Sequence, residues 1–237
     1  MKLLVEKDID GRLSRDELLV YNYAVLNRLP VRSVARESVS SFDLTLAEFA
    51  LTLDYLPVGS ISFVHDCLRK LNINVPDLSC YPSSLKGYLC RDIYTMSLGD
   101  ALNLNKAVFI KPCRCKLFTG GVVGGLKIDE IVNTERVYVC DPVSFQCEYR
   151  YYVLDGRILG SSFYSGDESI GEPDLSVVQS AVDAYSDAPA AYSLDFGLMA
   201  GSTVLVEAND GYSLACYSLP IPDYLRFLEA RYSQILG

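Results

Sequence analysis

Hydrophobic and polar positions follow two periodicities in the first third of the chain. Three short β-prone runs predict strands, at residues 3–5, 30–35 and 49–53. Apolar residues at helical spacing predict two helices, at 18–26 and 61–71. Ser14 and Glu17 form a capping-box pattern ahead of the first helix, and residues 57–60 break the chain before the second. Because strands and helices alternate, we predict a small N-terminal α/β lobe over residues 1–80.

From residue 81 onward the pattern becomes one of successive strands with few helices. Six β-prone segments cover residues 107–111, 136–140, 146–154, 157–164, 190–197 and 203–209. Apolar residues recur at helical spacing over 174–185 and 222–236. The last two strand segments flank Gly201 and predict a hairpin. An α+β domain built on antiparallel sheet is therefore expected for residues 81–237.

Composition restricts the class of protein further. Of 237 residues, 50% are hydrophobic and 22% charged, which indicates a globular chain. No apolar stretch is long enough to span a bilayer, and Glu6 interrupts any signal-peptide core, so we expect a cytoplasmic protein with no membrane partner. A net charge of −9 with dispersed basic residues argues against nucleic acid as a partner.

Cysteine and histidine chemistry is not expected. The eight cysteines include no Cys-x-x-Cys pair, and His65 is the single histidine, which argues against a zinc site. Cys113 and Cys115 flank Arg114, which could lower a thiol pKa, but no base accompanies them. Reduced and mostly buried thiols are the reading we favour.

Oxygen-bearing side chains gather on the predicted C-terminal hairpin. Side chains alternate between the two faces of a strand, so Glu207 and Asn209 should share a face with Leu205. Asp195 can join them from the neighbouring strand. The three oxygen ligands Asp195, Glu207 and Asn209, here called the acidic hairpin, suit a hard ion such as magnesium. The structural alternative is that residues 209–211, Asn-Asp-Gly, form a tight turn and the acidic residues are merely solvated.

A lysine followed by glycines forms a second candidate site. Lys111 lies in the strand segment Val-Phe-Ile-Lys-Pro at residues 108–112, and Thr-Gly-Gly-Val-Val-Gly-Gly follows at 119–125. Glycines allow backbone N–H groups to approach phosphate oxygens. Alone, the lysine could be a solvated strand end and the glycines a hairpin turn.

Taken in chain order, the lysine strand, the glycine-rich segment, the acidic segment near Glu148 and the acidic hairpin resemble the ATP-grasp superfamily. The chain looks most like a compact phage and bacterial clade of it. The resemblance covers residues 57–217 and implies the ATP-grasp fold, in which two α+β lobes grip a nucleotide. The central lobe would span about residues 81–140 and the C-terminal lobe about 141–237, with the N-terminal α/β lobe preceding both.

The resemblance implies phosphate-binding roles for basic residues and glycines. Lys111 would contact the α- and β-phosphates of ATP, and Lys116 would assist it. Gly120 and Gly121 would belong to the mobile loop that covers the phosphates. Arg91 stands where the family carries an earlier basic phosphate contact, and an arginine there could bind oxygens bidentately.

The resemblance also implies where adenine and ribose bind. Residues 139–143 resemble the hinge that holds adenine through backbone groups, with Asp141 and Val143 as binding residues. Pro142 lacks an N–H, so a neighbour such as Val143 must supply any backbone donor. Glu148 stands where the family places the carboxylate that binds the ribose hydroxyls.

The chain departs from the family at one catalytic position. Many ATP-grasp ligases carry an arginine shortly before the first metal aspartate to stabilise the acyl phosphate, but Ser193 and Leu194 stand there. Arg150 lies two residues beyond Glu148 on the same predicted strand face, so we expect it to be catalytic in place of the missing arginine. Arg157 is a second candidate, and a surface ion pair between Glu148 and Arg150 is the structural alternative.

The activity implied is that of an ATP- and magnesium-dependent ligase, which forms a C–N amide bond through an acyl phosphate. Its substrates would be a small-molecule or peptide carboxylate and an amine. Such phosphoryl transfer needs positioned charge rather than a histidine base. The alternatives are an ATP-grasp small-molecule kinase and a non-catalytic nucleotide-binding or interaction protein. The sequence leaves the substrates and the oligomeric state open.

Overall fold

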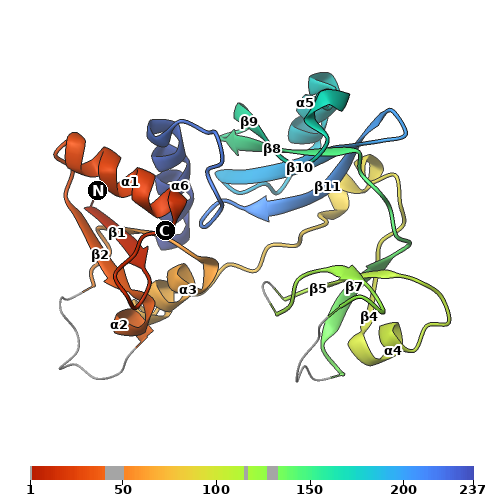
Figure 1. Ribbon diagram of the computed structural model, residues 1–237, viewed down its shortest axis with the longest axis horizontal. Helices are drawn as coiled ribbons and strands as arrows, with labels where there is room; N and C mark the ends of the chain where they lie inside the picture. The colour runs from red at the N-terminus through yellow and green to blue at the C-terminus, as the bar shows by residue number, and fades with distance from the viewer. Residues whose placement is uncertain (1, 41–50, 115–116, 127–132) are drawn as a thin grey trace.

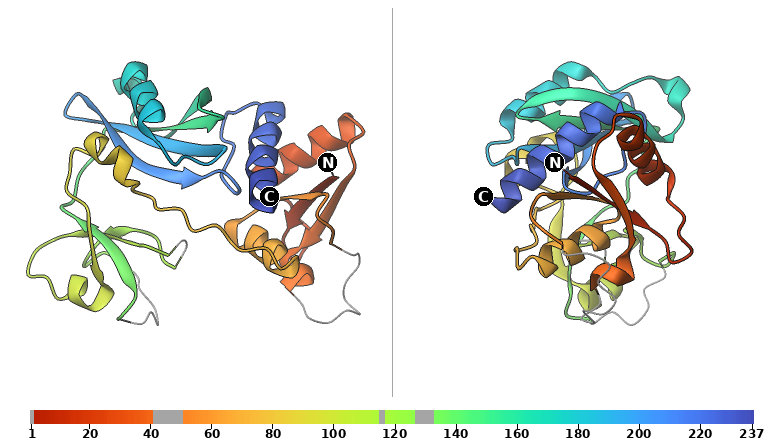
Figure 2. Two further views of the ribbon diagram at one scale, coloured as in Figure 1. Left: turned by 180° about the vertical axis from the view of Figure 1, so that it is seen from behind. Right: turned by 90° about the vertical axis from the view of Figure 1, so that its left-hand side faces the viewer.

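A computed structural model describes residues 2–40, 51–114, 117–126 and 133–237 of the chain. Within these residues the strands form a parallel three-stranded sheet and two antiparallel four-stranded sheets (Figure 1). Figure 2 shows the same arrangement from behind and from the side. None of the helices in these ranges is long and apolar enough to cross a membrane.

The N-terminal sheet is parallel, with its strands in the order β2-β1-β3. The strands are β1 (Lys2–Lys7), β2 (Val31–Ala35) and β3 (Tyr55–Val58). The helices of this region are α1 (Arg15–Leu26), α2 (Arg36–Ser40) and α3 (Ile61–Lys70). Leu3, Leu4 and Val5 of the central strand are fully buried, as expected for a parallel sheet covered on both faces. The alternation of strand and helix predicted here is confirmed.

The third strand lies later in the chain than predicted. It spans Tyr55–Val58, whereas residues 51–53 are irregular and residues 49–50 lie outside the described ranges. Pro57, taken as part of a break, is inside this strand. β3 is an edge strand, where the missing N–H of proline removes no bond on the open side.

The capping box predicted for α1 is not formed. Ser14 is the N-cap residue with an extended backbone, but its side chain accepts no hydrogen bond. Oε2 of Glu17 is buried and has no hydrogen-bond partner among the described residues. The first turn of α1 instead carries Asp16 and Glu17, whose negative charges favour a helix N-terminus.

The central sheet is antiparallel, with its strands in the order β4-β7-β5-β6. The strands are β4 (Tyr94–Ser97), β5 (Phe109–Pro112), β6 (Gly121–Val122) and β7 (Arg136–Cys140). Helix α4 (Leu98–Leu102) adds Leu98 and Ala101 to a small core with Ile110 and Val139. β4 and α4 were not predicted, because elements of four and five residues show too little periodicity.

The C-terminal sheet is antiparallel, with its strands in the order β11-β10-β8-β9. The strands are β8 (Cys147–Leu154), β9 (Arg157–Gly166), β10 (Ala191–Met199) and β11 (Ser202–Asp210). The remaining helices are η1 (Ser83–Tyr88), η2 (Glu168–Ile170), α5 (Leu175–Ala184) and α6 (Ile221–Leu236). Tyr149 and Tyr151 of β8 share a core with α5, which covers one face of the sheet (Figure 1). Glu148 and Arg150 point to the opposite face, here called the site face.

Helix α6 shares a core with the N-terminal lobe. Phe227 and Leu228 of α6 lie in the same cluster as Leu3, Phe63 and Tyr152. The apolar part of the site face, at Tyr152, is therefore covered by α6 and the N-terminal lobe. The polar part, with Glu148 and Arg150, lies outside this core. The lobe boundaries at residues 80 and 140 remain a proposal. Helix α6, at the end of the chain, packs into the core of the N-terminal lobe.

Candidate functional site

Strand register brings the acidic hairpin together on the site face. Across β8, β10 and β11, Arg150 is paired with Asp195 and Asp195 with Glu207. Asn209 is paired with Ser193, two residues before Asp195 on β10. These neighbours come from strand pairing, as the hairpin pattern predicts, whereas their role as metal ligands stays a prediction.

A β-bulge in β11 corrects the predicted position of Leu205. The register shifts between Asp195 and Phe196, which leaves Val206 unpaired between Leu205 and Glu207. Leu205 is consequently buried in the core beneath α5 and does not share a face with Glu207. The bulge allows one strand to place an apolar side chain in the core and a carboxylate two residues later on the site face.

The tight-turn alternative for residues 209–211 is wrong for the first two of them. Asn209 and Asp210 are the last residues of β11 and pair with β10. The hairpin turns at Ala200 and Gly201, which have φ angles of 50° and 79°. The sequence prediction placed Gly201 correctly, because glycine adopts this left-handed backbone conformation readily.

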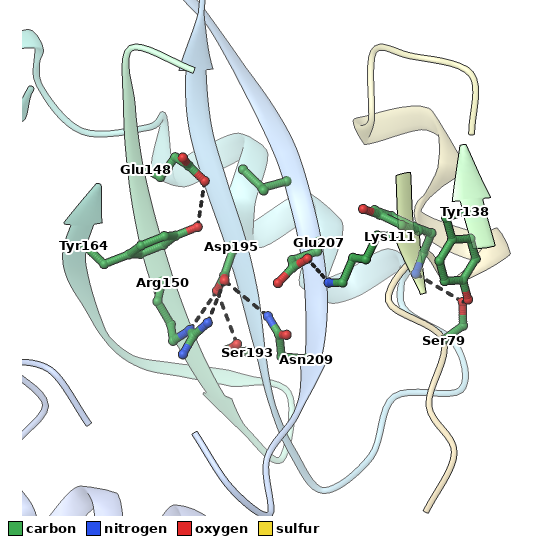
Figure 3. A network of polar contacts seen from close by, with 12 residues as sticks. Ser79, Lys111, Tyr138, Glu148, Arg150, Tyr164, Ser193, Asp195, Glu207 and Asn209 are labelled. Carbon is green, nitrogen blue, oxygen red and sulfur yellow. Dashed lines mark hydrogen bonds and ion pairs between the residues drawn. The ribbon is translucent and has the colours of Figure 1, made fainter. Parts of the chain in front are cut away.

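Asp195 is almost completely buried, with 1% of its surface exposed. The Arg150 fork donates from Nε to Oδ1 at 2.9 Å and from Nη2 to Oδ2 at 2.7 Å (Figure 3). Ser193 Oγ donates to Oδ1 at 3.3 Å, and Asn209 Nδ2 donates to Oδ2 at 3.2 Å. Four hydrogen bonds therefore offset much of the cost of burying this carboxylate.

Burial and pairing oppose each other in the pKa values of this pair. Burial raises the pKa of the Asp195 carboxyl, and the Arg150 guanidinium counteracts it. Burial also disfavours the charged form of Arg150, but the Asp195 carboxylate raises the guanidinium pKa above its usual range. Arg150 therefore stays charged at any working pH. The surface pair between Glu148 and Arg150, considered as an alternative, is not formed.

Two tyrosines outside the predicted site cover Arg150. The Tyr164 hydroxyl donates to Glu148 Oε2 at 2.8 Å. The rings of Tyr164 and Tyr217 have centroids 5.7 and 5.4 Å from the Arg150 Cζ, and they stack on each other at an interplanar angle of 16°. Tyr164 is unpaired at a bulge of β9, and Tyr217 has a φ of 45°. Both backbone conformations depart from regular alternation, so no sequence period signals these two side chains.

Lys111 connects the central sheet to the C-terminal sheet. From β5 its ammonium forms an ion pair with Glu207 Oε2 on β11 (Figure 3). The ammonium also lies 6.0 Å from the centroid of the Tyr81 ring. Burial lowers the pKa of Lys111, but Glu207 raises it and the net shift is upward. The alternative of a solvated strand-end lysine is therefore wrong.

Arg91 is bound to the backbone of the β11 bulge. Its guanidinium donates to three backbone carbonyls, at 3.0, 2.9 and 2.7 Å, those of Leu89, Leu205 and Val206. Its Cζ lies 5.9 Å from the Tyr81 ring centroid and 5.6 Å from that of Phe145. Most N–H groups of the Arg91 guanidinium are thus used in hydrogen bonds that stabilise the fold. A phosphate contact by Arg91 stays a prediction and would have to use the remaining N–H groups.

The glycine-rich segment packs back against the Lys111 strand. Gly121 begins β6, which pairs antiparallel with β5, so it lies in a strand of a β-hairpin rather than in a hairpin turn. A Cβ at Gly120 would lie 3.0 Å from the Phe109 ring and 3.2 Å from the Lys111 Cβ, so a larger residue would require these neighbours to shift by a few tenths of an ångström. Binding of phosphates by Gly120 and Gly121 stays a prediction. Lys116 lies outside the described residues.

The predicted adenine hinge lies between the central and C-terminal sheets. Residues 141–146 connect the end of β7 to the start of β8. Asp141 accepts a hydrogen bond from Lys106 Nζ at 2.6 Å, and the Val143 side chain is exposed. Both residues are therefore at a connection between lobes, where a hinge is expected, and their contact with adenine stays a prediction.

The donor set of the acidic hairpin fits magnesium. Two carboxylates and one amide supply oxygen ligands, which a hard cation prefers. No group of three or more His, Cys, Asp or Glu side chains suited to a metal occurs in the described part of the chain, so Asn209 would have to act as the third ligand. Its Nδ2 now faces Asp195. A half-turn of the amide would present Oδ1 to the same space.

Two antiparallel sheets joined by a hinge, with a lysine on one and carboxylates on the other, are the arrangement of the ATP-grasp fold. The chain belongs to the family described as ATP-grasp domain, R2K clade family 2, whose sequence profile matches residues 88–227. The family resemblance and the fold class predicted from the sequence are thereby confirmed. No match was found among curated proteins.

Solved ATP-grasp structures share the fold at low sequence identity. A RimK domain ATP-grasp protein from Sphaerobacter thermophilus DSM 20745 has a TM-score of 0.51 and 14% identity, over 100% of both chains. The macrocyclase MdnC from Microcystis aeruginosa MRC, bound with precursor peptide MdnA, has a TM-score of 0.52 and 10% identity, over 100% of this chain and 99% of that one. The ATP-grasp ligase PsnB, in complex with a phosphomimetic variant of its minimal precursor, Mg and ADP, has a TM-score of 0.51 and 10% identity, over 97% of each chain.

Proposed function

We propose that this protein is an ATP- and magnesium-dependent ligase that joins a carboxylate to an amine through an acyl phosphate. The observation that carries the proposal is the row formed by Arg150, Asp195 and Glu207, with Lys111 reaching it from the facing sheet. The basic side chains of Arg150 and Lys111 lie next to the carboxylates of Asp195 and Glu207. Phosphoryl transfer requires such positioned charges and metal ligands. Family membership and the Mg and ADP complex of PsnB support the choice of nucleotide and ion.

The nucleotide would lie between the central and C-terminal sheets. Asp141 and Val143 would meet adenine and Glu148 the ribose. The phosphates would be held by basic side chains and glycines, namely Arg91, Lys111, Lys116, Gly120 and Gly121. Asp195, Glu207 and Asn209 would hold magnesium, which, when bound, neutralises phosphate oxygens during transfer. Lys111 would exchange Glu207 for the α- and β-phosphates as the nucleotide enters.

The reaction would have two steps. A substrate carboxylate oxygen attacks the γ-phosphorus, the bond to the β–γ bridging oxygen breaks, and ADP leaves. The amine then attacks the acyl carbon, loses a proton, and expels inorganic phosphate to leave an amide. Arg150, a planar fork held by Asp195, would stabilise the charge that develops on the oxygens in both steps.

Measuring ADP release against a panel of acid–amine pairs, including amino acids and small peptides, tests the proposal. A ligase releases ADP only when both partners are present and forms an amide detectable by mass spectrometry. Release without amine, with a stable phosphorylated product, would instead identify a kinase. Nucleotide binding without turnover across the panel would identify a non-catalytic binding protein.

A further inference from the structure

Tyr81 contacts two of the basic side chains proposed to hold the nucleotide phosphates. The Lys111 ammonium lies 6.0 Å from the centroid of the Tyr81 ring, and the Arg91 Cζ lies 5.9 Å from it. The negative face of an aromatic ring attracts cations within about 6 Å of its centroid. Burial raises the pKa of the Tyr81 hydroxyl, so the side chain is neutral at physiological pH and attracts the two cations through its ring.

The segment that carries Tyr81 is fixed to both antiparallel sheets. On the C-terminal sheet, the Ala208 N–H donates to the Cys80 carbonyl at 2.9 Å. On the central sheet, the hydroxyl oxygens of Ser79 and Tyr138 lie 2.9 Å apart (Figure 3). The Ser79 hydroxyl oxygen also accepts the Tyr81 N–H at 3.1 Å. The backbone of Tyr81 is therefore held from two sides.

Tyr138 also orients the Tyr81 ring. The two rings meet edge to face, with their centroids 4.8 Å apart and 86° between their planes, a geometry that aromatic pairs prefer. Tyr138 lies directly opposite Lys111 in the pairing of β7 with β5, so the two side chains share a face of the central sheet. The ring that meets the Lys111 ammonium is therefore held by the strand next to that lysine.

Lys111 needs a contact that does not depend on Glu207. Burial lowers the pKa of Lys111, and among the groups that raise it the Glu207 carboxylate has the largest effect. Under the proposed function, Glu207 leaves the ammonium to bind magnesium. The face of the Tyr81 ring is negative and carries no oxygen ligand, so neither phosphate nor magnesium competes for it. The ring can therefore hold the ammonium while its carboxylate partner is exchanged for phosphate.

We propose that Tyr81 is a positioning residue, which holds the Lys111 ammonium in place for the nucleotide phosphates. This inference rests on the proposed function and adds to it a residue that acts through Lys111. Because the ring attracts the charge of the ammonium, its loss should weaken ligands that carry phosphates and spare those that do not. A general loss of packing would weaken both kinds of ligand alike.

Calorimetric titration of the full chain with ATP and magnesium, and separately with adenosine, tests this role. Tyr81→Leu removes the ring. It should weaken ATP by about 2- to 30-fold, the range of a cation–π contact, and leave adenosine affinity unchanged. Tyr81→Phe keeps the ring and should restore the affinity for ATP. Tyr88→Leu, which removes a half-buried tyrosine at the end of η1, is the matched control.

Unchanged ATP affinity in Tyr81→Leu overturns the proposal, as do equal losses for ATP and adenosine or a failure of Tyr81→Phe to restore ATP binding. The loss caused by Tyr81→Leu should also shrink when Lys111→Ala is already present, and an undiminished loss there overturns the proposal too. If Tyr81→Leu fails to fold, phenylalanines with increasing numbers of fluorine atoms at position 81 give the same comparison. Fluorine weakens the negative face of the ring while nearly keeping its shape, so ATP affinity should fall with each fluorine, and a constant affinity rejects the role.

The result is separable from the ligase proposal because binding is measured without acid or amine. A selective loss of ATP affinity in Tyr81→Leu, in a chain that forms no amide, would reject the ligase and keep the role of Tyr81. Amide formation without a selective loss in that variant would reject the role of Tyr81 alone.

Discussion

Lys111 on β5 and Glu207 on β11 form an ion pair that joins the central sheet to the C-terminal sheet. Both side chains are about one-fifth exposed, so the pair is partly screened from water. Nucleotide phosphates would compete with Glu207 for the ammonium, and a metal would compete with Lys111 for the carboxylate. The same contact can therefore hold the two lobes together before ATP arrives and release both groups to it.

Replacing Lys111 with alanine should weaken ATP binding far more than adenosine binding. Only ATP presents the negative charge that the ammonium meets. Calorimetric dissociation constants for both ligands measure this difference. Lys2→Ala, which removes an exposed lysine of the N-terminal lobe, is the matched control. Equal losses for ATP and adenosine in Lys111→Ala would place this lysine away from the phosphates.

Replacing Glu207 with glutamine should raise the magnesium requirement of turnover while leaving the fold intact. Altering groups that only support metal ligands already costs about 10–100-fold in affinity or activity, and a ligand should cost at least as much. Magnesium titration of ADP release measures the shift, with Glu168→Gln, a change on the exposed η2 turn, as control. An unchanged magnesium dependence rejects Glu207 as a ligand.

Replacing Arg150 with lysine should lower kcat by about 10²–10³, the usual loss when one donor to developing charge is removed. ATP affinity should change little, because charge is kept and only the planar fork is lost. The split between kcat and KM for ATP measures this. Arg226→Lys, on the exposed face of α6, is the control. Normal turnover would reduce Arg150 to a structural partner of Asp195 and direct attention to Arg157.

The protein should lose stability between pH 7 and about pH 5.5 through His65. Burial, assisted by Arg69, lowers the imidazole pKa, and Nε2 lies 2.8 Å from the Tyr212 hydroxyl oxygen. The unfolded chain, with an ordinary pKa of about 6.5, takes up the proton first as pH falls. Stability is thus present above that value and is lost as pH falls through the lower folded pKa.

Urea unfolding at the two pH values measures this loss. The free energy of unfolding of the His65→Gln variant should depend less on pH than that of the natural chain, since glutamine does not titrate. Identical pH dependence of the two proteins would show that the imidazole takes up its proton equally readily in both states.

The sequence by itself determined most of the longer elements and the order of the motifs. β-prone runs were enough to predict β7 and the acidic hairpin, and apolar residues at helical spacing were enough to predict α6. Both patterns are local properties of the chain. The Lys-Pro strand, the glycines that follow and the oxygen-bearing hairpin were enough to indicate the family. Leu205 shows the limit of such patterns, since a single bulge at Val206 moved it to the other face.

Tertiary structure alone decided which charges meet. The sequence placed Arg150 on the strand face of Glu148, and strand pairing then brought it to Asp195, 45 residues away in the chain. Lys111 found Glu207 across 96 residues and between two sheets. Such partners depend on register, bulges and lobe packing, which are fixed by long-range contacts rather than by local spacing. For the same reason Tyr164 and Tyr217, brought over Arg150 by a bulge and a left-handed residue, carried no signal in the sequence.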